Sequence, residues 1–236
     1  ARETERVLLR KWNRFLCSCA SLADVPPPTL RRMLACGVPT HHRAHVWAFC
    51  SAAAPSPRGA HAPVADAAAA AEIDREIGRD LARTFPEHPL YADADAGLCP
   101  ALGRILRDHA ELNPSVGYCQ GLNFVAAVLL LHADERTALA LLHALTDRLM
   151  PGYHAPDMGG LHAAQDKLVD EMRAALPALH AHLEAQGAPV RALSTHWLLC
   201  AYVDALPLAC AMRVWDLLFE VPDPPPPSAR APHPPC

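Results

Sequence analysis

Apolar residues recur along most of this chain at intervals of three and four, which is the period of an amphipathic α-helix. Ile73, Ile77 and Leu81 have this spacing, and it predicts a helix that begins near Asp66 and buries one face. Alternation of apolar and polar residues, which is typical of a half-buried strand, is nearly absent. The pattern therefore predicts an all-α fold.

The breaks between helices fall mostly at proline, glycine and residues that cap helices. Residues 29–36 are expected to form a short helix that Gly37 ends. Thr40 is a candidate N-cap for a helix that contains Arg43 and Trp47. Further helices are expected over residues 101–110, 118–132, 134–150, 163–176, 177–186, 194–206 and 208–220.

Changes in composition divide the chain into segments. Residues 52–71 are rich in alanine and proline and are expected to be a flexible, low-complexity insertion. Residues 222–236 are rich in proline and are expected to be a disordered tail. The main domain would then span residues 29–221, after a helical lead-in over residues 1–28.

Charge, cysteine content and the length of apolar runs limit the partners and the cellular compartment expected for this protein. The net charge of −4 and the scattered arginines give no basic stripe, so nucleic acid is not an expected partner. The nine cysteines are odd in number and lie mostly in apolar helical patterns, which indicates reduced thiols in a cytoplasmic protein. The longest apolar run, residues 124–131, would span about 12 Å as a helix, too short for a bilayer core of about 30 Å. Any membrane contact is therefore expected to be indirect.

Ile77, Asp80 and Arg83 are spaced by three residues, so they lie along one stripe of the predicted helix. Ile77 can enter the core while Arg83 emerges near the helix end, which is expected close to Phe85. A plainer interpretation is a surface ion pair between Asp80 and Arg83, three residues apart. From the spacing alone, the plainer interpretation is favoured.

A second short run, Gly117-Tyr118-Cys119-Gln120-Gly121, precedes an apolar helix. Gln120 would project from the start of that helix, where free backbone N–H groups suit an anionic partner. The alternative is a glycine-flanked turn in which the tyrosine packs and the glutamine caps the helix. Neither run is decisive by itself.

Together the motifs have a specific order. Arg43-x-x-x-Trp47, Ile77-x-x-Asp80-x-x-Arg83 and Tyr118-x-Gln120 resemble the three signature motifs of the TBC domain, the Rab GTPase-activating module. The resemblance covers about residues 30–220 without the insertion. It extends to the runs Cys36-Gly-Val-Pro, Leu149-Met-Pro-Gly-Tyr153 and Met212-Arg-Val-Trp215-Asp216.

The resemblance implies an all-helical fold of two lobes that completes the active site of a GTPase rather than a self-contained enzyme. Arg83 would be the arginine finger and Gln120 the glutamine finger, and the partner would be a GTP-bound Rab that carries the GTP and Mg²⁺. The chain would need no cofactor or metal of its own, and it would reach membranes only through the Rab. The residues expected to support the fingers are Arg43, Trp47, Ile77, Asp80, Tyr118, Gly121 and Asn123.

The family pattern also implies further helices after Trp215-Asp216, whereas this chain passes into proline after Glu220. The C-terminal lobe is therefore expected to be incomplete, with apolar surface exposed on residues 208–220. Two alternatives remain open. One is a catalytically weak Rab-binding or scaffold module, and the other is a helical interaction protein without a GTPase partner.

Two other kinds of site were weighed against the motifs. His41, His42 and His45 with Cys17 and Cys19 offer zinc ligands, but the two cysteines are too close in sequence for a usual chelate. A serine hydrolase built on Ser115 or Ser194 with His196 is not expected, because the chain lacks the strands for a nucleophile elbow.

Overall fold

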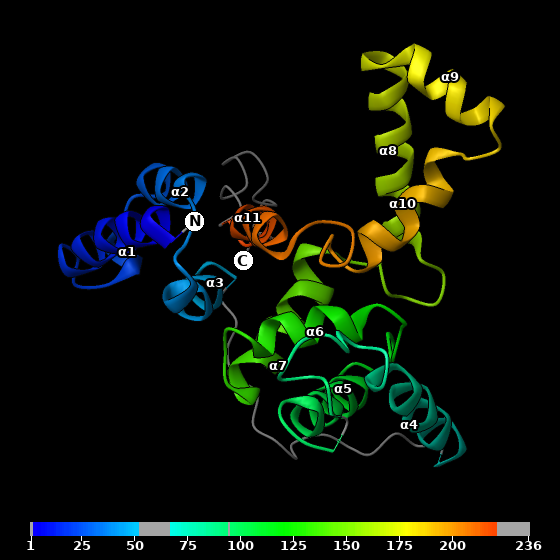
Figure 1. Ribbon diagram of the computed structural model, residues 1–236, viewed down its shortest axis with the longest axis horizontal. Coiled ribbons are helices and arrows are strands. Elements are labelled where there is room, and N and C mark those ends of the chain that lie inside the picture. Colours follow the sequence, from blue (N-terminus) through cyan, green and yellow to red (C-terminus); the bar gives the residue numbers. More distant parts are fainter. Residues whose placement is uncertain (1, 52–66, 94, 221–236) are drawn as a thin grey trace, which may run out of the picture.

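The computed structural model describes residues 2–51, 67–93 and 95–220, and every regular element in these ranges is a helix (Figure 1). The predicted all-α class is therefore confirmed. The expected tail, residues 222–236, lies outside the described residues, as does most of the expected insertion, residues 52–66. None of the helices in the described ranges has the length and apolar character needed to cross a membrane.

The N-terminal helices form a small unit of their own: α1 (Arg2–Cys17), α2 (Pro27–Cys36) and α3 (Arg43–Cys50). Gly37 ends α2 with a φ of +99°, a conformation that favours glycine. The indole of Trp12 donates a hydrogen bond of 2.6 Å to the carbonyl oxygen of Gly37. The core of this unit consists of Trp12, Leu22, Leu30, Met33, Leu34, Val38, Val46 and Cys50.

The main core lies around α6 (Leu122–Leu130), in which eight of nine residues are buried. A helix that is apolar on nearly all sides is stable only when other helices surround it. Here α4 (Ala67–Leu81), α5 (Cys99–Leu112) and α7 (Glu135–Ala144) pack against it, and α7 continues into a π-helical turn, Leu145–Leu149. Tyr91 closes one end, where its hydroxyl donates to the carbonyl of Ala127 at 2.7 Å.

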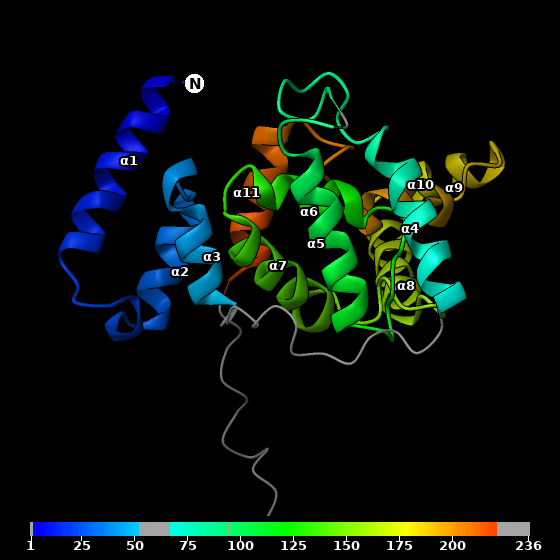
Figure 2. The ribbon, with the colours of Figure 1, turned by 90° about the horizontal axis from the view of Figure 1, so that it is seen from below.

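Three further helices, α8 (Gly159–Ala175), α9 (Pro177–Ala185) and α10 (Val190–Leu199), extend away from this core (Figure 1). Figure 2 shows α1 to α3 on one side of the molecule, α8 to α10 on the other, and α5 to α7 between them. The amide of Gln165 joins α8 to α10 by donating to the carbonyl of Arg191 at 2.8 Å. No residue of α9 is buried.

The last helix, α11 (Leu208–Leu218), returns beside α2 and brings Asp216 into the interior. The carboxylate of Asp216 accepts from Arg43 Nε at 3.1 Å, Trp47 Nε1 at 3.2 Å and the backbone of Val38 at 2.9 Å. The ring of Trp47 stacks on Phe219 with centroids 5.0 Å apart. These contacts connect the start of the main domain to the end of the described chain. Three large apolar side chains of α11 remain exposed, namely Leu208, Val214 and Leu217.

Several helix boundaries differ from the predicted ones. The helix expected from residue 118 begins at Leu122, because Gly121 adopts a φ of +109° that no helix contains. The helix expected to end near Phe85 stops at Leu81. The helix expected over residues 194–206 spans Val190–Leu199 instead, and the chain then turns through Ala201 and Tyr202 at positive φ. Thr40 begins a 3₁₀ turn, Thr40–His42, rather than capping α3.

Candidate functional site

Arg83 and Gln120 meet at a surface cavity of about 350 Å³ between the end of α4 and the turn that precedes α6. They come from segments that the sequence separates by more than 30 residues, so the fold itself brings them together. The residues that line the cavity are Glu76, Arg79, Asp80, Arg83, Tyr118 and Gln120.

Asp80 holds Arg83 in place at the end of α4. The Arg83 backbone N–H donates to the carbonyl of Asp80 at 3.2 Å, and its guanidinium lies 2.6 Å from the Asp80 carboxylate. The Asp80 side chain is 6% exposed, whereas that of Arg83 is 52% exposed. The guanidinium of Arg83 is therefore bound by a buried carboxylate on one side, while about half of the side chain is exposed to solvent.

Tyr118 ties the second segment to the same carboxylate. Its hydroxyl donates to Asp80 Oδ2 at 2.5 Å. Burial and, secondly, the hydrogen bond to Asp80 raise the pKa of Tyr118, so the hydroxyl remains a proton donor at neutral pH. One carboxylate thus joins both candidate fingers through Arg83 on one side and Tyr118 on the other.

Gln120 is exposed on the turn before α6, two residues ahead of the first helical residue. The adjacent Gly121 donates its N–H to Asn123 Oδ1 at 3.1 Å, and Asn123 Nδ2 donates to Thr84 Oγ1 at 2.8 Å. Thr84 in turn donates to the carbonyl of Asp80 at 2.6 Å. Asn123 and Thr84 are fully buried, so this chain of bonds is shielded from water.

Thr84 was not singled out from the sequence. A signal exists, because a threonine just past a helix end often donates to the carbonyl four residues earlier, which is Asp80 here. Ile77 lies fully buried in the main core one turn before Asp80 and fixes α4 against it. The supporting set around the cavity is therefore Ile77, Asp80, Thr84, Tyr118, Gly121 and Asn123.

Arg43 and Trp47 lie elsewhere. They are buried and bind Asp216, so they hold α3 to α11 and do not line the cavity of Arg83 and Gln120. Asp216 ends the run Met212-Arg-Val-Trp215-Asp216, and the sequence alone did not indicate what its side chain binds. Its position on an apolar helix was the available signal, since a buried carboxylate needs several donors.

The cavity offers ligands for an anion rather than a nucleophile. Arg83 presents a planar set of N–H donors that matches phosphate oxygens, and Gln120 has an amide that can donate and accept at once. No serine, cysteine or histidine lines it. Its side chains can position and stabilise a reacting group through charge and hydrogen bonds.

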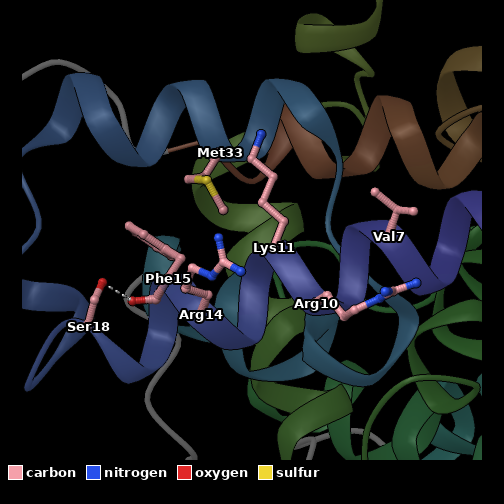
Figure 3. Close-up of a pocket in the computed structure, with 7 residues that line it drawn as sticks. All are labelled: Val7, Arg10, Lys11, Arg14, Phe15, Ser18 and Met33. Atoms are coloured by element: carbon pink, nitrogen blue, oxygen red, sulfur yellow. Dashed lines mark hydrogen bonds between the residues drawn. The ribbon is translucent and has the colours of Figure 1, made fainter.

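A second cavity, of about 530 Å³, lies between α1 and α2 and contains none of the predicted site residues (Figure 3). Figure 3 shows Met33 of α2 facing Phe15 and Lys11 of α1 across it. The ammonium of Lys11 lies 2.9 Å from Cys36 Sγ. Surface helices commonly carry such cations above apolar side chains.

Known proteins are similar to this chain in sequence and in fold. The family model of the Rab-GTPase-TBC domain matches residues 40–224. Growth hormone-regulated TBC protein 1 of Homo sapiens is 35% identical over 216 residues, which cover 89% of this chain and 63% of that protein. Its relative 1-A from Danio rerio is 34% identical over 195 residues, 80% of this chain and 55% of that protein. The chain thus spans less than two thirds of the length of these two relatives.

Solved structures of two Rab-GAP domains have the same fold as this chain. The Chlamydomonas flagellar RabGAP TBC domain superposes with a TM-score of 0.70 at 26% identity, over 93% of this chain and 76% of that one. The Ypt/Rab-GAP domain of Gyp1p has the same fold, with a TM-score of 0.68 at 17% identity over 90% of this chain and 80% of that one. From its sequence and its helical architecture, the chain belongs to the Rab-GTPase-TBC domain family.

Proposed function

We propose that this chain accelerates GTP hydrolysis by a Rab-family GTPase, with Arg83 and Gln120 inserted together into the GTPase active site. The observation that carries the proposal is that these two residues line one exposed cavity, where the buried Asp80 carboxylate binds Arg83 directly and binds the turn of Gln120 through Tyr118. Membership of the Rab-GTPase-TBC family supports it, as do the Rab-GAP domains among the structural matches.

Arg83 would stabilise the charge that spreads over the transferring phosphoryl group. One of its terminal nitrogens contacts Asp80, and an arginine has five N–H donors, so donors remain for phosphate oxygens. An arginine supplied to a GTPase in this way accelerates hydrolysis by about 10³ to 10⁵, or roughly 4 to 7 kcal/mol of barrier. The anchor reduces the entropy lost when the guanidinium meets the phosphate.

Gln120 would orient the attacking water. Its amide oxygen can accept from the water while its NH₂ group donates to a carbonyl, and its exposed position leaves both groups accessible to a partner. In this role it would replace the glutamine that many GTPases supply themselves. The bonds through Gly121, Asn123 and Thr84 would keep the turn rigid during the reaction.

The remaining reaction components would come from the partner. The GTP-bound Rab would carry the nucleotide and Mg²⁺, so the chain would complete an active site rather than contain one. A cytoplasmic chain of this kind would contact membranes through the Rab.

Single-turnover GTP hydrolysis by a panel of purified Rab proteins tests this function. We expect at least one Rab to be stimulated, and we expect Arg83→Ala and Gln120→Ala each to remove most of the stimulation. Arg75→Ala is a matched control, because Arg75 lies two turns earlier on the exposed face of α4 and pairs with Glu72. Gln186→Ala, at the end of α9, is the control for Gln120.

Two results would overturn the proposal. One is stimulation that survives both substitutions. The other is a folded protein that binds a GTP-loaded Rab without accelerating hydrolysis, which would favour the catalytically weak binding or scaffold module instead.

A further inference from the structure

Three metal-ligating side chains gather where α10 ends. His196 lies on the last turn of α10, Cys200 caps the helix, and Asp204 follows in the next turn. The ligand atoms of these residues all lie within 4.8 Å of one another. In the part of the chain that the structure describes, no other group of three or more histidine, cysteine or acidic residues meets this condition.

The spacing of the donors suits a single ion. Cys200 Sγ lies 3.8 Å from His196 Nε2, and the same nitrogen contacts Asp204 Oδ2. A tetrahedral Zn²⁺ with Zn–S of about 2.3 Å and Zn–N of about 2.0 to 2.1 Å places sulfur and nitrogen roughly 3.6 Å apart. The sulfur and nitrogen are therefore almost at ligand spacing, and the imidazole and carboxylate must separate to admit the ion.

A catalytic nucleophile is a different interpretation of a cysteine, a histidine and an aspartate side by side. Cys200 has no exposed surface. A nucleophile must reach its substrate, and a thiol enclosed in this way does not.

We propose that Cys200 Sγ, His196 Nε2 and an Asp204 carboxylate oxygen bind one Zn²⁺, with water in the fourth position. Thiolate, imidazole and carboxylate are the three donor types that zinc uses in proteins. On binding, the ion displaces the thiol proton, which leaves to solvent, as is general for zinc and cysteine. The exposed imidazole provides the route by which the ion enters.

The site lies directly against the turn that carries Gln120. A Cβ placed on Gly121 would come within 3.3 Å of Cys200 Sγ, and the ring of Phe124 on α6 meets the His196 ring edge to face at 6.2 Å. A bound ion would therefore fix the turn after α10 at the place where it packs against the start of α6. Its binding does not depend on stimulation of a GTPase by the chain.

Titration of the untagged, reduced full chain with Co²⁺ as a spectroscopic substitute for Zn²⁺ tests the site. We expect one equivalent to give tetrahedral visible bands and a thiolate-to-metal charge-transfer band, and Zn²⁺ to displace both. His196→Gln and Asp204→Asn change exposed or partly exposed side chains, so they should leave the fold intact. Each should weaken binding by more than the roughly 10- to 100-fold that loss of an outer hydrogen-bond partner costs.

Cys200→Ser should remove the charge-transfer band, and circular dichroism checks that this buried substitution still allows folding. Cys210→Ser and His180→Gln are controls, since Cys210 is exposed on α11 and His180 lies on α9. Binding that is unchanged in His196→Gln and Asp204→Asn would overturn the proposal. So would the absence of a stoichiometric tetrahedral complex in the wild-type chain, which would leave an ion pair beside a packed thiol.

Discussion

Two arginine–aspartate pairs in this molecule contain the arginines of adjacent signature motifs but lie in opposite environments. Arg43 and Asp216 are 9% and 0% exposed and stand 173 residues apart in sequence. Arg83 and Asp80 are three residues apart, and the arginine is 52% exposed. The first pair is locked between helices, whereas the second leaves its cation able to meet a partner.

Burial decides what each pair can do. Removing one partner from a buried pair leaves a charge without compensation, which costs about 3 to 5 kcal/mol. An exposed pair contributes about 0 to 1 kcal/mol, so its cation can leave the carboxylate at little cost. A motif arginine can therefore hold the fold or act on a partner, and the exposure of its side chain shows which.

The largest expected effect is on the locked pair. Asp216→Ala removes the acceptor of Arg43, Trp47 and the backbone N–H of Val38, and we expect the free energy of unfolding to fall by about 3 to 5 kcal/mol. Chemical denaturation followed by circular dichroism measures it. Asp170→Ala, which breaks the exposed pair with Arg173, is the control. Equal losses in both variants would remove the distinction between the two environments.

A buried histidine without a hydrogen bond extends the comparison of buried and exposed charges. His109 is 1% exposed, and among the residues that the structure describes neither of its ring nitrogens has a hydrogen-bond partner. Burial, with smaller effects of His143 and His154, lowers its pKa from 6.5 to about 3. The unfolded chain therefore binds the proton first as the pH falls.

The free energy of unfolding is thus expected to fall by about 1.4 kcal/mol per pH unit between about 6.5 and 3 on account of His109. At pH 4 this amounts to roughly 3 kcal/mol. Denaturation at several pH values should show a shallower acid loss for His109→Leu than for the wild type. His182→Leu, at an exposed position, serves as the control, and parallel curves for all three chains would contradict the prediction.

Tyr118→Phe probes the link between the two fingers. It removes one hydrogen bond to the buried Asp80 carboxylate, for which we expect a loss of about 1.5 to 3 kcal/mol in the free energy of unfolding. Tyr153→Phe is the matched control, since the Tyr153 hydroxyl makes no hydrogen bond with the described residues. If both variants unfolded at the same denaturant concentration, Asp80 would not need the tyrosine.

The smallest expected effect on stability is at Arg83. Arg83→Ala should change the free energy of unfolding by less than about 1 kcal/mol, because the side chain it removes is 52% exposed and Tyr118 still donates to the buried Asp80 carboxylate. The same purified variant used for GTP hydrolysis can be examined by thermal denaturation. A loss comparable with that of Asp216→Ala would mean that Arg83 supports the fold and is not free to act in trans.

Patterns within short stretches of the sequence were sufficient to predict much of the helical structure. The apolar period predicted the helical class and most of the helices, because amphipathic helices record their buried faces in the sequence. The spacing of Asp80 and Arg83 predicted their ion pair for the same reason. Gly37 also ended its helix as expected, since its conformation is local.

Contacts between segments that are distant in the sequence could not be predicted from such local patterns. The role of Asp216 emerges only when α11 lies beside α3, and that of Thr84 only when Asn123 approaches it. The start of α6 was misplaced because no pattern within the run from Tyr118 distinguishes a turn from a first helical turn. The meeting of His196, Cys200 and Asp204 depended on where α10 ends, which was also misplaced.

The separation of 173 positions between Arg43 and Asp216 also sets the time between their synthesis. A ribosome adds about 5 to 20 residues per second, so Arg43 emerges roughly 9 to 35 s before the aspartate that neutralises it. During that interval the nascent chain carries an unpaired cation and an uncovered Trp47. The contact of α3 with α11 can therefore form only after almost the whole described chain has been translated, and chaperones have that time in which to bind α3.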